Sequence, residues 1–265
     1  MRKSGMRDDE ALMLGAAAAS GATGVLASML ASSVLNRRVS KTLSSMRGTP
    51  PSRLKLFWKN IPRDIQRRVK AIRVPGFRNA AFIPARPYPL IVTDEKGKTT
   101  FLESKKNYIL YDPGFFIPGV VAHEYGHATD WLRNKCTLGG EASKDLLAGL
   151  LGSGVMLGGP FLLSAATRDL MPKSGLGRGL ALAGVLGGGA VLGGLGSYLS
   201  QYPTLKSERT ASDFAREVIA KSRLAAANAE ANRRALKEAY RTYSVPPVLS
   251  GALLGLGAGL AGQVR

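Results

Sequence analysis

The sequence predicts a mostly α-helical fold, in which a bundle of four membrane-spanning helices carries a smaller polar portion of mixed α and β structure. Two observations support this prediction. Four long stretches contain almost no charged residues, and each is close to the length of about 20 residues that a helix needs to cross a bilayer. Between the first two stretches lie short runs rich in β-branched and aromatic residues, which favour strands.

The apolar stretches are rich in Gly, Ala and Ser. They cover residues 11–35, 146–166, 179–200 and 245–264. Glycines recur at a spacing of four, as in Gly189 with Gly193, and in lipid this spacing lets helix backbones approach closely. Pro160 interrupts the second stretch and a triple-glycine run interrupts the third, so we expect these two spans to be the least regular.

The stretches divide the chain into five segments. These are a tail with the first span (1–35), a basic polar region with a small sheet and one helix (36–145), two spans joined by a short turn (146–200), a long polar helix (201–244) and the fourth span (245–265). Most of the 37 Lys and Arg lie in the two polar segments, which four spans place on the same side. The positive-inside rule therefore predicts a multi-pass protein whose polar segments face the cytoplasm or its equivalent.

The first polar segment is expected to begin with a helix and continue with a sheet. Residues 54–78 form a basic amphipathic stretch, which either lies on an anionic membrane surface or packs on the polar region as an ordinary helix. The runs 88–93, 99–102 and 108–111 then predict a small antiparallel sheet, with a turn at residues 95–98.

The clearest chemical signal is a pair of histidines four residues apart. Residues 120–130 read VVAHEYGHATD, and Pro118 suits the first turn of a helix that carries them. Positions four apart lie on one helix face, so His123 and His127 can present both imidazoles to a single metal ion. They are also the chain's two histidines, and the one cysteine, Cys136, excludes a Cys-based zinc cluster.

Glu124 lies beside this pair in the HExxH pattern of zinc peptidases. We expect Zn²⁺ to be the cofactor, since two imidazoles with an open position leave room for a catalytic water. Zinc lowers the pKa of its water to about 7, and Glu124 would act as the general base that takes the proton during peptide hydrolysis.

Such a site needs a third protein ligand, and three carboxylates are candidates. Asp130 lies one turn beyond His127 and suits a group that orients an imidazole N–H, Glu141 follows two glycines, and Glu208 lies far downstream. Glu208 is the favoured candidate, because Ala211, Ser212 and other small residues share its face of a helix expected from Pro203 to about Tyr243. Those small side chains permit a close approach to the helix of the two histidines.

Three segments together resemble the YugP-type (neutral zinc metallopeptidase 2-like) membrane zinc metallopeptidases. They read VAHEYGHA from Val121, ERTASDFA from Glu208 and LKEAYRTY from Leu236, with two apolar stretches between the first and second. More distantly the order is similar to the HtpX-type membrane gluzincins. The resemblance covers roughly residues 108–260. It implies a zincin-like α+β catalytic portion with His123, His127 and Glu208 as zinc ligands and Glu124 as base.

The expected function is that of an integral-membrane zinc metalloendopeptidase acting on a peptide or protein substrate. Tyr243 is a further candidate, either as an oxyanion stabiliser or as an aromatic anchor at the membrane interface. The alternative is a non-enzymatic membrane or virion structural protein. Its basic face, part of a net charge of +19, would bind nucleic acid or anionic lipid.

Overall fold

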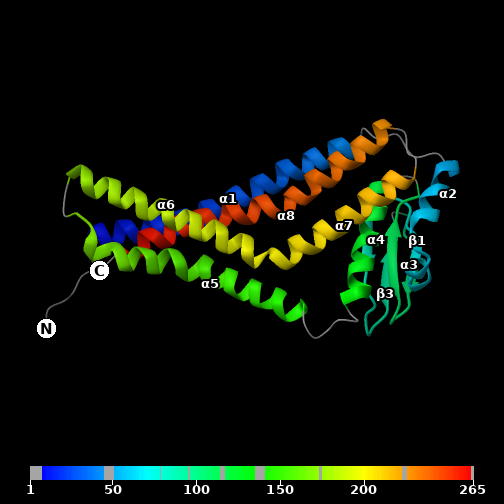
Figure 1. The fold of residues 1–265 in the computed structure, drawn as a ribbon, viewed down its shortest axis with the longest axis horizontal. Helices are drawn as coiled ribbons and strands as arrows, with labels where there is room; N and C mark the ends of the chain where they lie inside the picture. Colours follow the sequence, from blue (N-terminus) through cyan, green and yellow to red (C-terminus); the bar gives the residue numbers. More distant parts are fainter. Residues whose placement is uncertain are drawn as a thin grey trace. The chain divides into compact units, whose positions relative to one another are not determined.

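The structure is a computed structural model, and its helices and strands are drawn in Figure 1. It describes residues 8–44, 51–77, 79–94, 96–113, 117–134, 141–172, 175–222 and 226–263. The chain divides into two compact units. We call Met1–Leu35, Ser143–Leu205 and Arg241–Arg265 the apolar unit, and Asn36–Ala142 and Lys206–Tyr240 the polar unit.

The fold is mostly helical, as predicted. The helices are α1 (Asp8–Ser44), α2 (Pro51–Asn60), α3 (Arg63–Arg68), α4 (Pro118–Asn134), α5 (Glu141–Thr167), α6 (Gly175–Ser200), α7 (Tyr202–Lys221) and α8 (Ala226–Ala261), with a short 3-10 helix, η1 (Arg168–Leu170), after α5. The strands are β1 (Val69–Arg73), β2 (Ala80–Ile83), β3 (Leu90–Thr93), β4 (Thr99–Leu102) and β5 (Asn107–Tyr111).

Among the described residues, three helical segments are long and apolar enough to cross a membrane. These are Ala18–Thr42, Gly175–Ser200 and Asn228–Ala261. The second predicted span passes the same test only as a bent pair, Leu147–Met156 and Gly158–Leu170, with 40° between its halves. Pro160 lies just past the bend, and a proline ring displaces the carbonyl four residues earlier. The triple-glycine run of α6 leaves that helix continuous.

Glycines bring the helices of the apolar unit into backbone contact, as their spacing predicted. A Cβ atom at Gly189 of α6 would lie 2.6 Å from the carbonyl oxygen of Gly255 of α8. A Cβ atom at Gly196 would lie 2.7 Å from the carbonyl oxygen of Gly152 of α5. In lipid the helices gain little from apolar burial, so close packing of this kind is their main source of association.

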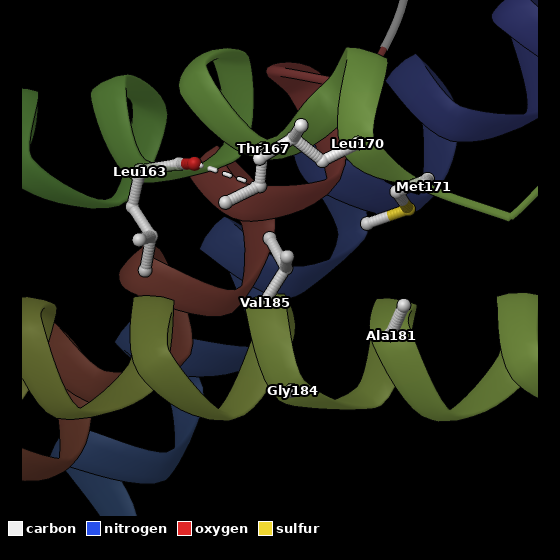
Figure 2. Close-up of a pocket in the computed structure, with 7 residues that line it drawn as sticks. All are labelled: Leu163, Thr167, Leu170, Met171, Ala181, Gly184 and Val185. Carbon is white, nitrogen blue, oxygen red and sulfur yellow. Dashed lines mark hydrogen bonds between the residues drawn. The ribbon is translucent and has the colours of Figure 1, made fainter.

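The apolar unit contains a pocket between the C-terminal part of α5 with η1 and the first half of α6 (Figure 2). Its walls are formed by Leu163, Thr167, Leu170, Met171, Ala181, Gly184 and Val185. The hydroxyl of Thr167 donates a hydrogen bond of 2.8 Å to the carbonyl oxygen of Leu163 rather than pointing into the space. The walls carry no ionisable side chain, so this pocket offers no acid–base or metal-binding chemistry.

The sheet of the polar unit differs from the predicted one. β5 lies between β1 and β2, pairing parallel with β1 and antiparallel with β2. β3 and β4 form a separate antiparallel hairpin. The expectation of one antiparallel sheet from the runs 88–93, 99–102 and 108–111 was therefore wrong, because β5 pairs with strands from earlier in the chain.

The prediction for residues 54–78 was also wrong, because part of this stretch forms β1. The stretch 54–78 is not one amphipathic helix: α2 and α3 end by Arg68, and β1 begins at Val69. Ile65, Val69 and Ile72 recur at helical spacing, which concealed the strand in the sequence. Val69 pairs with Asn107, and such a long-range partner leaves no local signal.

The long polar helix predicted between Pro203 and about Tyr243 is also two helices. α7 ends at Lys221, and α8 runs on from Ala226 through the fourth apolar stretch to Ala261. The sequence around the break contains neither Gly nor Pro. The composition therefore gave no signal for the end of α7 and the start of α8. Residues 223–225, between the two helices, lie outside the described ranges.

Candidate metal centre

α4 is fixed between the sheet and the helices α7 and α8. Its buried face includes Val121, Ala122, Tyr125 and Ala128, which pack with β2, β5, α7 and α8 in one hydrophobic core. The opposite face of the sheet packs separately against the β3–β4 hairpin. α4 is therefore the helix on which the polar unit is built, and a side chain on it has a defined position.

The first turn of α4 is held by a side chain from α8. The backbone N–H of Gly119 donates a hydrogen bond of 2.8 Å to Oδ1 of Asn232, which is only 2% exposed. The first N–H groups of a helix have no partner within the helix, so this buried amide oxygen satisfies one of them. Asn232 thereby joins the first turn of α4, the helix that carries His123 and His127 (the metal-motif helix), to α8.

α4 and α7 touch backbone to backbone beside the histidines. A Cβ atom at Gly126 would lie 2.5 Å from the Cα and 2.7 Å from the carbonyl oxygen of Ala211. Ala211 and Ala215 are completely buried on the facing side of α7. Small residues on both helices thus allow α7 to bring its side chains within reach of His123 and His127.

Three potential metal ligands meet at this contact. Oε2 of Glu208 lies 3.1 Å from Nε2 of His123, and Oε1 lies 3.4 Å from Nε2 of His127. The two Nε2 atoms are 3.1 Å apart, and the imidazole planes cross at 88°. One ligand atom from each residue falls within 4.8 Å of the others, the one such group of His, Cys, Asp and Glu found in the described part of the chain.

The remaining ring nitrogens face hydroxyl groups that flank Glu208 on α7. Nδ1 of His123 lies 3.3 Å from Oγ of Ser212, and Nδ1 of His127 lies 3.3 Å from Oγ of Ser207. The Ser207 hydroxyl donates a hydrogen bond of 3.1 Å to Oδ2 of Asp130. When each Nδ1 donates to a serine oxygen, each Nε2 can keep the lone pair that ligates a metal ion; without an ion, Nε2 donates to the Glu208 carboxylate only when it is protonated.

The charges within the group reinforce this arrangement. Burial would raise the pKa of Glu208, but hydrogen bonds and charge from His123 and His127 outweigh it and lower the pKa to about 2. Burial would likewise lower the pKa of His127, but the hydrogen bond and charge of Glu208 raise it. Glu208 is therefore an ionised carboxylate in the form in which it ligates a metal.

Glu124 occupies a half-buried position, close enough to His123 and His127 for their charges to act on it. Its Oε2 accepts a hydrogen bond of 2.7 Å from the backbone N–H of Phe82, on the edge strand β2. Burial raises the pKa of Glu124, while the charges of His123 and His127 act to lower it. A carboxylate with a raised pKa beside a metal site is suited to accepting a proton and returning it.

The other predicted site residues lie elsewhere. Glu141 begins α5, and its side chain is outside the described part of the structure, as is Cys136. Tyr243 lies on α8 within the apolar unit and is 43% exposed. Ser207 was not predicted as a site residue and Ser212 only as a small helix-face residue, since a lone serine has no spacing signal that links it to an imidazole.

The donor set fits a divalent transition metal. Two imidazole nitrogens and one carboxylate are a set of protein ligands that zinc takes in catalytic sites. The group can hold a metal ion, and its residues alone do not identify which one. Comparison of the chain with models of known families, with curated proteins and with solved structures found no significant match.

Proposed function

We propose that this chain is an integral-membrane zinc metalloendopeptidase. The observation that carries the proposal is the convergence of His123, His127 and Glu208, with the half-buried carboxylate of Glu124 beside them. Two imidazoles and an acidic side chain on an HExxH helix, joined by a carboxylate from a second helix, form an arrangement that suits zinc-dependent peptide hydrolysis. The sequence resemblance to membrane zinc metallopeptidases supports the same proposal.

The residues would have distinct roles. Bound zinc would supply Lewis acidity, which polarises a carbonyl and makes water a nucleophile near neutral pH. Glu124 takes a proton from the attacking water and delivers it to the leaving amine, for which its burial-raised pKa is suited. Ser207 and Ser212 contact the imidazoles at Nδ1, which would leave both Nε2 atoms free to hold the ion.

The proposal includes a zincin-like polar unit and four membrane crossings, with the bent α5 as one of them. The clustering of Lys and Arg in residues 36–145 and 201–244 favours a cytoplasmic or equivalent side for the metal group. Substrates would then be peptides or proteins that reach the membrane from that side. Asp130, joined to His127 through Ser207, would orient an imidazole rather than bind the metal.

The test is Glu124→Gln in the full-length protein, purified in detergent. The variant is expected to retain its zinc and to lose hydrolysis of a quenched-fluorescent peptide library, since an amide cannot accept the proton. Glu217→Gln is the matched control, because Glu217 is exposed on α7 and pairs only with its neighbour Lys221 among the contacts described. If Glu124→Gln cleaves as fast as the parent protein, the proposed mechanism is wrong.

A further inference from the structure

The β3–β4 hairpin presents an exposed apolar pair to solvent. Ile91 and Phe101 are direct cross-strand partners, and they are 56% and 70% exposed. In a half-buried hairpin the solvent face is ordinarily polar, so an aliphatic–aromatic pair there is unusual. Tyr88, just before β3, is a further exposed aromatic at 57%. We call this the hairpin outer face.

The inner face of the same hairpin is already occupied. Leu90, Val92 and Leu102 alternate with the exposed residues and pack against Tyr108 and Leu110 of β5. Ile109 and Tyr111, at the alternate positions of β5, pack instead in the hydrophobic core that includes α4. The outer face is therefore directed away from the metal-motif helix, so a peptide held at the metal group does not cover it.

Basic residues lie next to the hairpin strands in the sequence. The exposed ones are Arg86, Lys96, Lys98, Lys105 and Lys106. The nearby acidic groups are partly engaged: Oδ1 of Asp94 accepts hydrogen bonds from the backbone N–H groups of Lys96 and Lys98. Glu103 pairs with Lys106 at 2.6 Å. The hairpin thus combines an exposed apolar patch with flanking sequence in which basic residues outnumber acidic ones.

We propose that the hairpin outer face docks on the surface of an anionic bilayer. Apolar and aromatic side chains flanked by lysines in the sequence match the boundary between acyl chains and negatively charged headgroups. A phenol such as that of Tyr88 also favours this boundary, since its ring is apolar and its hydroxyl is polar. A bilayer is favoured over a protein partner because the chain carries helices that can cross a membrane, which keeps a lipid surface near the polar unit. The proposal does not rest on peptidase activity.

The test places a nitroxide spin label at Thr99, on the outer face two residues before Phe101. The natural cysteine is first removed by Cys136→Ser, and the label is attached to Thr99→Cys in the full-length protein. The matched control is a label at Glu217→Cys, on the exposed side of α7. Collisions with oxygen and with a water-soluble nickel complex are measured in vesicles of phosphatidylcholine, with and without phosphatidylglycerol.

In vesicles with phosphatidylglycerol, the ratio of oxygen to nickel collisions at residue 99 is expected to rise several-fold above that at residue 217. The double substitution Ile91→Ser with Phe101→Ser should abolish the rise. Lys96→Glu with Lys98→Glu should reduce it, as should high salt, because salt screens exposed charges. The proposal is overturned if the label at 99 is as accessible to nickel as the label at 217. It is also overturned if vesicles of phosphatidylcholine alone shield the label equally, because anionic headgroups would then play no part.

Discussion

Gly126 of α4 and Ala211 of α7 are in direct backbone contact: a Cβ atom on the glycine would lie 2.5 Å from the Cα of the alanine. On α4 Gly126 lies between His123 and His127 in the sequence, and on α7 Ala211 lies three residues after Glu208. The separation of the helices at this point therefore sets whether the carboxylate reaches the imidazoles.

Gly126→Ala is expected to weaken the metal group and to destabilise the polar unit by about 1–3 kcal/mol, the usual cost of overpacking. The added methyl meets backbone, which cannot move aside, so α4 and α7 must separate. Gly187→Ala is the control, because a Cβ there meets nothing within 4 Å. Zinc titration and thermal unfolding distinguish the two variants; equal behaviour would show that the helices are not closely packed at Gly126.

Ser207→Ala is expected to lower zinc affinity by about 10–100-fold, the usual effect of removing a group that orients a ligand. The substitution removes the hydroxyl that links Nδ1 of His127 to Asp130. Competition with a chromogenic chelator measures the affinity, and Thr210→Ala, at an exposed position of α7, provides the control. An unchanged affinity for the Ser207 variant would mean that His127 needs no partner on Nδ1.

Asn232→Ala is expected to destabilise the polar unit by about 1–3 kcal/mol, because it leaves the buried N–H of Gly119 without its acceptor. Arg233→Ala, at an exposed neighbouring position of α8, should have little effect. Both tryptophans of the protein, Trp58 and Trp131, lie in the polar unit, so their fluorescence reports its unfolding. If the two variants unfold at the same temperature, the hydrogen bond does not hold α4.

Removal of zinc is expected to lower the unfolding temperature of the polar unit. A ligand that binds only the folded state stabilises it by about 2.7 kcal/mol at a hundredfold excess over its dissociation constant. Tryptophan fluorescence followed during heating, with and without a chelator, measures the difference. Glu208→Ala should make the protein insensitive to the chelator, and continued sensitivity of that variant would place the stabilising metal elsewhere.

The sequence predicts those parts of the molecule that are specified locally. The spacing of His123 and His127 places both on one face of α4, and the small residues after Glu208 mark the face of α7 that meets it. The run 99–102 becomes β4 with the same bounds. In each case neighbouring residues alone determine the pattern.

What could not be predicted depends on partners far away in the chain. The parallel pairing of β1 with β5 joins Val69 to Asn107, and β1 itself has apolar residues at helical spacing. The contact of Ser207 with His127 exists only because α7 returns to α4. The bend of α5, by contrast, has a local signal, because Pro160 marks this helix as irregular in the sequence.

Metal analysis of the full-length protein tests the central claim most directly. Protein purified in detergent is expected to contain one zinc ion per chain, and both His123→Ala and Glu208→Ala are expected to lose it. The exposed control Glu217→Ala should retain it. Absence of zinc from the parent protein under zinc-replete conditions, or its full retention in Glu208→Ala, would contradict the account.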